Sequence, residues 1–107
     1  MIEITYTHEF QREYKRLSRK YSSLESDIKG LVETLLTNPM AGTPLGSQLF
    51  KIRWPVTSKG KGKSGGVRVI TYFKVINNEL YLLDIYDKSE RETISIKELR
   101  SIIQSIR

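Results

Sequence analysis

Apolar and polar residues alternate at the start of the chain and then change to a helical spacing. Residues 2–6 alternate, with Tyr6 in the apolar phase, which predicts a short strand with one buried face. From Phe10 to Tyr21 the apolar residues come every three or four positions, and the basic residues lie mostly off this stripe. This spacing predicts an amphipathic helix, which Thr7 is suited to cap.

A second helix is predicted directly after the first. Apolar residues from Leu24 to Leu36 again form one stripe, and Ser22 with Glu25 has the spacing of a capping box. The helix is expected to end at Asn38, because the residue before a proline is pushed out of the helical region. Two helices joined by so short a connection form an antiparallel hairpin.

The second half of the chain has the pattern of three strands. Residues 40–48 contain two glycines and a proline and show no period, so we predict a loop there. Residues 49–54, 67–75 and 80–86 alternate in the manner of strands, and a turn signal separates the last two.

A closing helix completes the pattern. Residues 87–93 form a charged connector, and Ser95 with Glu98 has capping-box spacing before an apolar stripe that reaches Ile106. The predicted order is β-α-α-β-β-β-α. This is an α+β fold in which the helix hairpin packs on a small twisted antiparallel sheet, with the other face partly open. At 107 residues, the chain is expected to be one domain spanning residues 1–107.

Charge changes the picture in one region. No acidic residue occurs between Glu33 and Glu79, and this gap holds seven lysines and arginines. Outside the gap the chain has 11 basic and 12 acidic residues, so the net charge of +6 arises entirely within it. An ordinary surface mixes both signs. We therefore predict a polyanion-binding surface, with RNA the favoured ligand, although a solvated sheet face is the alternative.

Composition disfavours several other classes of function. The chain has no cysteine, and its one histidine, His8, lies away from the basic gap, so a transition-metal site is not expected. Gly62-Lys63-Ser64 imitates the end of a phosphate-binding loop, but the helix that such a loop requires is replaced by a strand. We expect a cytoplasmic protein without a signal peptide or a membrane span.

Polar residues after the last predicted strand form a candidate acid–base cluster. They are Tyr86, Lys88 and Glu90, for which composition alone favours a solvated turn. Trp54 is also open to two interpretations, because it can stack on a base or anchor the end of its strand.

Three runs of sequence resemble a known family. They are K-I-R-W at residues 51–54, G-K-G-K-S-G-G-V-R-V-I-T-Y at residues 60–72 and L-Y-L-L-D-I-Y-D-K-S-E at residues 80–90. Together they resemble the RelE/HigB branch of the RelE/ParE superfamily, the toxins of type II toxin–antitoxin systems. The resemblance covers the whole predicted element order, is most specific from Leu49 to Ile94, and implies a RelE-like fold.

The resemblance implies an mRNA interferase, a ribosome-dependent endoribonuclease that inhibits translation and uses no metal or cofactor. A ribose 2′-OH attacks the adjacent phosphate, which requires a base, positive charge and an acid. By position in the motif, Arg68 would bind the scissile phosphate, and Lys88 would lie near it. Glu90 would be a base or an orienting group, and either Tyr86 or Tyr72 would stack on a base or donate a proton.

The other candidate residues would hold the backbone or bases of mRNA and ribosomal RNA. They are Lys51, Arg53, Lys59, Lys61, Lys63, Tyr72 and Lys74. The chain departs from the family pattern at Thr93, where an aspartate is usual. If that aspartate caps the last helix, Ser95 can replace it, whereas a catalytic role for it would be unfilled here.

The resemblance also implies a partner, a cognate antitoxin of the helix-turn-helix type. Two other functions remain open. One is a ParE-like toxin that acts by binding DNA gyrase, and the other is a non-catalytic module that binds RNA or the ribosome. The basic loop and strands argue against the gyrase function, because a protein-binding poison does not need this charge.

Overall fold

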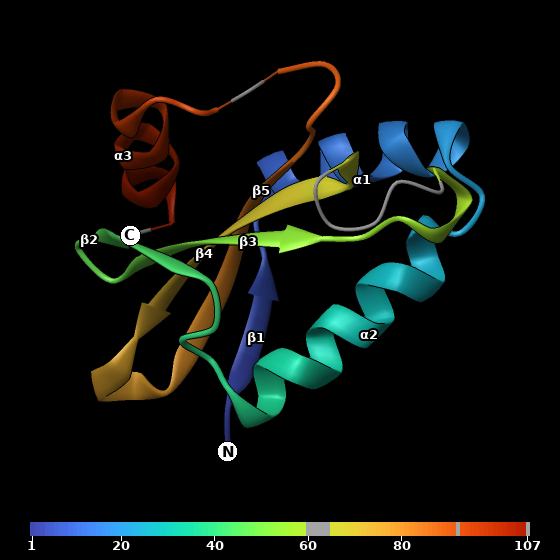
Figure 1. Cartoon of the computed structure of the whole chain (residues 1–107). Helices are drawn as coiled ribbons and strands as arrows, with labels where there is room; N and C mark the ends of the chain where they lie inside the picture. Colours follow the sequence, from blue (N-terminus) through green and yellow to red (C-terminus); the bar gives the residue numbers. More distant parts are fainter. Residues whose placement is uncertain (60–64, 92, 107) are drawn as a thin grey trace.

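The helices and strands of the computed structural model follow the predicted order closely (Figure 1). The structure describes residues 1–59, 65–91 and 93–106. Within these ranges the elements are β1 (Glu3–Tyr6), α1 (His8–Lys20), α2 (Leu24–Thr37), β2 (Thr43–Gly46), β3 (Leu49–Trp54), β4 (Val67–Lys74), β5 (Glu79–Asp87) and α3 (Ile96–Ser105). The short 3-10 turns η1 (Thr57–Lys59) and η3 (Val75–Asn77) precede and follow β4. The predicted α+β class is confirmed.

Hydroxyl groups set the start of the first and last helices. Thr7 Oγ1 accepts a hydrogen bond from the Phe10 N–H at 3.1 Å, which confirms the predicted cap of α1. The same hydroxyl donates to the carbonyl of Leu83 at 2.8 Å and so fixes α1 against β5. Ser95 and Glu98 form the predicted capping box of α3.

The capping box predicted for the second helix is wrong. The helix begins at Leu24, so the cap position belongs to Ser23 rather than Ser22, and Ser23 makes no capping hydrogen bond. Its hydroxyl instead donates to Asp27 Oδ2 at 2.7 Å. Its oxygen accepts the Ser58 N–H at 2.8 Å, so the hydroxyl joins the start of α2 to η1 instead of capping the helix.

The sheet is mixed, which corrects the prediction of an antiparallel sheet. Its strand order is β1-β5-β4-β3-β2, and β1 pairs in parallel with β5, with Glu3 opposite Glu79 and Tyr6 opposite Leu82. The other neighbouring strands pair in antiparallel fashion. Parallel pairing needs a long crossover connection, and the helix pair with the intervening strands supplies it.

Part of the predicted loop 40–48 is a strand. β2 pairs with β3 through a tight turn in which Ser47 and Gln48 both have positive φ, 54° and 68°. Two such residues suit a hairpin turn, but the Asn-Gly or Asp-Gly signal that usually marks it is missing. Pro44 is tolerated because β2 lies at the edge of the sheet.

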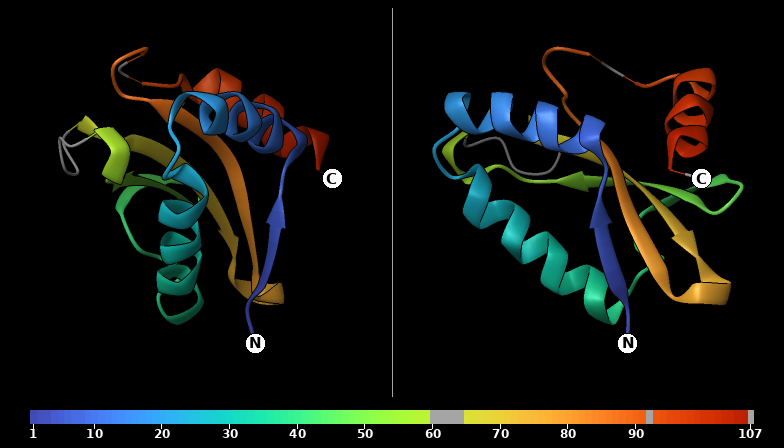
Figure 2. Two further views of the ribbon diagram at one scale, coloured as in Figure 1. Left: turned by 90° about the vertical axis from the view of Figure 1, so that its right-hand side faces the viewer. Right: turned by 180° about the vertical axis from the view of Figure 1, so that it is seen from behind.

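Helices cover both faces of the sheet (Figure 2). On one face, α1 and α2 pack on a core that includes Phe10, Leu31 and Val69. On the other face, α3 packs on a second core that includes Ile70 and Leu99. Because both faces of β4 are covered, its residues from Val67 to Phe73 are all buried. The basic face is therefore closed where α3 lies and open at Arg53, which is consistent with the prediction of a partly open face.

Candidate functional site

Three polar side chains form a row across the sheet. In strand register, Arg68 on β4 lies between Arg53 on β3 and Tyr86 on β5. Residues directly opposite on neighbouring strands have Cβ atoms about 5 Å apart. Strand alternation puts Arg68 on the face of Ile70, which is the face that α3 partly covers. Lys51 precedes Arg53 by two positions and so shares this face.

Arg68 is the buried centre of this row. It is 3% exposed, whereas Arg53 is exposed. Burial, and then the positive charge of Arg53, lower the pKa of the Arg68 guanidinium. An arginine remains charged at physiological pH even so. Two cations held side by side, one of them shielded from water, create a positive potential that attracts a phosphate. The planar donors of a guanidinium also match the geometry of phosphate oxygens.

Tyr86 closes the row with a phenol that keeps its proton. It is 3% exposed, and the guanidinium of Arg91 lies 5.6 Å from the centre of its ring. Burial raises the pKa of Tyr86 above its usual value, although Thr93, Arg68 and Arg91 oppose the rise. The phenol is therefore neutral near pH 7 and able to donate a proton to a neighbouring oxygen.

A glycine brings the turn after β5 close to the start of β4. The Lys88 N–H donates to the Gly66 carbonyl at 3.3 Å, which puts the Lys88 backbone beside the strand that carries Arg68. A Cβ atom on Gly66 would lie 2.0 Å from the carbonyl oxygen of Trp54. Any side chain at position 66 would therefore collide with the backbone of Trp54, which explains the second glycine of the G-G-V-R run.

Trp54 itself is an anchor between the sheet and α2. Its indole N–H donates to the carbonyl of Asp27 at 2.6 Å, and its ring packs against the core beneath α2. Of the two interpretations of this residue, the structure supports the strand-end anchor.

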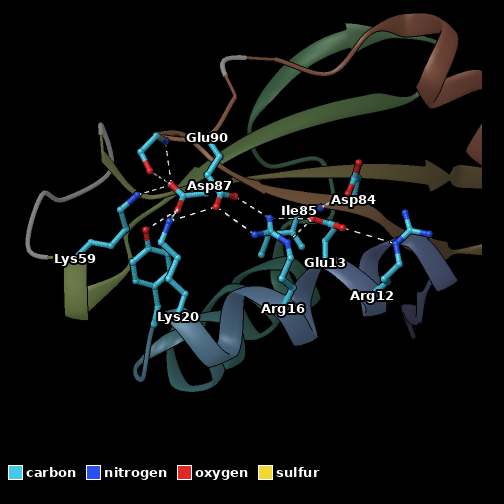
Figure 3. A network of polar contacts seen from close by, with 11 residues as sticks. Arg12, Glu13, Arg16, Lys20, Lys59, Asp84, Ile85, Asp87 and Glu90 are labelled. Carbon is cyan, nitrogen blue, oxygen red and sulfur yellow. Dashed lines mark hydrogen bonds and ion pairs between the residues drawn. The ribbon is translucent and has the colours of Figure 1, made fainter.

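A buried carboxylate, that of Asp87, joins the segments around the row (Figure 3). Asp87 is fully buried and accepts hydrogen bonds from Lys59 Nζ at 2.6 Å and from the Tyr21 hydroxyl at 2.5 Å. Ser89 donates through both its N–H and its hydroxyl, and Lys20 lies at 3.3 Å. Burial alone would raise the pKa of Asp87, but these donors outweigh it and hold the pKa well below its usual range.

Glu90 continues this chain of ion pairs. Its carboxylate receives Arg16 at 2.7 Å and Lys20 at 3.3 Å, so α1 is tied to the turn that carries Lys88. Arg16, followed by Lys20, lowers the pKa of Glu90. A carboxylate with a lowered pKa is a weak base, so these contacts favour the orienting role over that of a general base.

The remaining candidate residues have different surroundings. Lys59 has a side chain only 8% exposed, because Asp87 pairs with it. Tyr72 is buried and stacks on Tyr81, with ring centres 6.0 Å apart. Lys74 lies six residues beyond Arg68, roughly 20 Å along the strand, and pairs with Glu79 at 3.8 Å. Lys61 and Lys63 lie outside the described residues.

Four residues near the row were not singled out from the sequence. Asp84 and Asp87 interrupt an apolar strand, and an acid within such a strand is a signal that could have been used. Arg16 and Lys20 lie in a basic helix whose other lysines and arginines give no reason to prefer them. Their role follows only from the docking of α1 beside the turn after β5.

The described residues form neither a cluster of metal ligands nor a helix that could span a membrane. Within residues 1–59, 65–91 and 93–106, no group of three or more metal-ligating side chains lies close enough together to hold an ion. No helix in the described part of the chain is long and apolar enough to cross a membrane.

Comparison with known proteins identifies the family. Residues 4–105 match the family model of the RelE toxin of the RelE/RelB toxin–antitoxin system. The fold is similar to that of a doubly substituted mutant of E. coli toxin RelE in the free state, with a TM-score of 0.62, 14% identity, and 99% and 98% of the two chains covered. It is also similar to the isolated E. coli RelE toxin, with a TM-score of 0.61, 12% identity, and 97% and 98% covered. The chain therefore belongs to the RelE toxin family of toxin–antitoxin systems.

Proposed function

We propose that this toxin is a metal-independent endoribonuclease that cleaves mRNA on the ribosome, in the cytoplasm. A cognate antitoxin keeps it inactive. The row of Arg53, Arg68 and Tyr86 carries the proposal. It combines a partly shielded pair of cations with a protonated phenol, which are two of the three groups that cleavage by a 2′-OH requires.

The proposed reaction divides these roles. The 2′-OH gives its proton to a general base as its oxygen attacks phosphorus, a 2′,3′-cyclic phosphate forms, and the bond to the 5′-oxygen breaks. Arg68 binds the scissile phosphate and stabilises the charge of the pentavalent state, with Arg53 and Lys51 holding the neighbouring backbone. Tyr86 gives its proton to the departing 5′-oxygen. Lys88 lies at the scissile site, and Glu90 orients its turn through Arg16.

The test is expression of wild-type and variant chains in a translating extract, with mRNA 5′ ends mapped by primer extension. We expect new ends with wild type and a loss of at least about 100-fold with Arg68→Ala. Arg68→Lys keeps the charge but loses the two-pronged geometry, so it should recover only part of the activity. Lys74→Ala is the matched control, because it removes a cation from the far end of the same strand.

Three outcomes would contradict the proposal. Equal cleavage by wild type and Arg68→Ala, with both folded by circular dichroism, would remove Arg68 from the site. Arrest of translation without new mRNA ends would support a module that binds the ribosome without cutting. Normal translation together with replication-linked DNA damage would support the gyrase-binding alternative.

A further inference from the structure

A cleft of about 520 Å³ opens between α1 and α3 above the end of β5. Its floor includes Asp84, Ile85 and Tyr86, so Tyr86 is the side chain that it shares with the row of Arg53, Arg68 and Tyr86. The proposed reaction uses no other residue of this floor. Asp84 is the feature that calls for an explanation, because an acid buried in a strand costs free energy unless it is paired.

Asp84 is at a bulge in the sheet. The register between β4 and β5 shifts here, so that Ile70 is opposite Asp84 and Thr71 is opposite Leu82. Bulges redirect side chains, and here the Asp84 carboxylate lines the cleft. The residue as a whole is 93% buried. Its Oδ1 accepts the Ile85 N–H at 2.8 Å. Within the described ranges, no cation lies within ion-pair distance of either oxygen.

Three of the neighbouring carboxylates already have cations. On the α1 side, Arg16 pairs with Glu13 at 3.0 Å and also with Glu90. On the α3 side, Arg91 pairs with Glu98 at 3.1 Å. In Figure 3 the dashed lines connect residues from Arg12 to Lys59, and none joins Asp84 to a cation. Of the carboxylates that line the described part of the cleft, Glu9 and Asp84 have no ion pair, and of these two only Asp84 is buried.

The charge of the cleft also has the wrong sign for binding a nucleic acid. Its described lining has five carboxylates and four cationic groups, and it lies in a chain with a net charge of +6. The cations at its walls, apart from Lys97, are engaged with glutamates. A phosphate brought here would meet more negative than positive charge, whereas a cation would meet a buried carboxylate ready to pair.

We propose that this cleft receives one cationic side chain, an arginine or a lysine, from a protein partner, and that the Asp84 carboxylate is its ligand. The toxin–antitoxin family makes such a partner expected, and the inference does not depend on RNA cleavage. The occupant bridges α1 and α3 across Ser101 and covers the Tyr86 side of the row. Binding of the partner and access to Tyr86 are therefore coupled.

The experiment titrates N-acetyl-arginine amide into the ¹⁵N-labelled full chain and follows amide shifts by NMR. We expect saturable shifts at Asp84–Tyr86 and at the facing residues of α1 and α3. N-acetyl-citrulline amide has the same size without the charge and should bind at least tenfold more weakly. Asp84→Asn should weaken binding of the arginine probe at least tenfold, whereas Glu9→Gln, a change in the same cleft, should leave it unchanged.

Several results would overturn the proposal. They are equal binding by citrulline, equal binding by Asp84→Asn, or shifts confined to the Glu90 turn. Guanosine monophosphate is the nucleotide probe, and Asp84-dependent binding of it at these amides would assign the cleft to RNA instead. A second copy of the chain as occupant would appear as Asp84-dependent dimerisation in the absence of a probe.

A measurement on wild type keeps the test independent of whether Asp84→Asn folds. Burial raises the pKa of Asp84 to about 6, so binding of the arginine probe should weaken about tenfold from pH 7.5 to pH 5. Glu13 and Glu98 add to this rise and Arg91 opposes it. As a control for the one histidine of the chain, His8→Gln must show the same change. A pH-independent affinity would exclude Asp84 as the ligand.

Discussion

Arg68 and Asp84 are buried charges that burial affects in opposite directions. Loss of contact with water lowers the pKa of the Arg68 guanidinium and raises that of the Asp84 carboxyl to about 6. Arginine titrates so far from neutral pH that it stays charged. Asp84, in contrast, changes its protonation within the range in which the protein can be handled, which makes its contribution to stability measurable.

Replacement of Asp84 by asparagine should change how stability depends on pH. Between about pH 4 and pH 6, the folded chain holds a proton that an unfolded aspartate has lost, so the free energy of unfolding falls as pH rises. The wild type should therefore lose about 2–3 kcal/mol relative to Asp84→Asn between pH 4 and pH 7. Urea unfolding of both chains at a series of pH values measures this difference.

Glu9→Gln provides the control for this series, because it removes a carboxylate from the wall of the same cleft. Its stability should follow the wild-type pH dependence. A wild type that instead gains stability over Asp84→Asn as the pH rises would mean that Asp84 has a cationic partner in the folded chain. That result would contradict the contacts described for this side chain.

At the scale of elements, Asp87 joins α1, η1 and the turn after β5. Removing one member of a buried ion pair leaves the other charge unpaired and costs about 3–5 kcal/mol. Lys59→Met should therefore be strongly destabilising, and so should Asp87→Asn. The double variant should lose less than the sum, because it removes both charges. Urea unfolding of the four chains gives the coupling free energy between Lys59 and Asp87.

The matched control for this cycle is Lys74→Met with Asp87→Asn. Lys74 pairs with a different carboxylate at the far end of β4, so its effect should add to that of Asp87→Asn. Additive effects for Lys59 would mean that the buried pair does not behave as a unit.

The elements that could be predicted are those whose signal is local. The helix caps at Thr7 and Ser95 and the alternation of Arg53 and Arg68 depend on neighbouring residues, and the structure confirms them. β2 was missed because its turn uses Ser47 and Gln48 in place of the usual residues. The parallel pairing of β1 was missed because strand neighbours distant in sequence leave no periodic trace.

The site could be predicted only in part, for a related reason. The chain's basic gap directed attention to the region of Arg68, because net charge is visible in the sequence. Charge alone could not separate Lys59, which a buried aspartate neutralises, from Arg53, which is exposed. Likewise, the burial of Tyr72 depends on where α3 docks, and an amphipathic stripe does not specify which face of a sheet it will cover.

At the scale of the whole molecule, the distribution of charge predicts a salt dependence. If the Arg68 face binds RNA, each phosphate contact releases counterions, and the logarithm of affinity falls linearly with the logarithm of salt concentration. Lys51→Gln should reduce that slope by about 0.7–1, whereas Lys74→Gln should leave it nearly unchanged. Ribosome binding measured at several salt concentrations gives both slopes, and equal effects of the two substitutions would show that the binding surface extends over all of β4.

The pairing of β1 with β5 also bears on how the protein is made. Thr7 at the end of β1 hydrogen-bonds to Leu83, 76 positions later in the chain. Synthesis proceeds from the N-terminus. Until β5 has been synthesised, β1 therefore has no strand to pair with, and the apolar side of α1 lacks the strand on which it packs. The row of polar residues assembles at the same moment, because Tyr86 arrives with that strand. A nascent chain therefore has neither a finished sheet nor a finished row of polar residues until β5 has been synthesised.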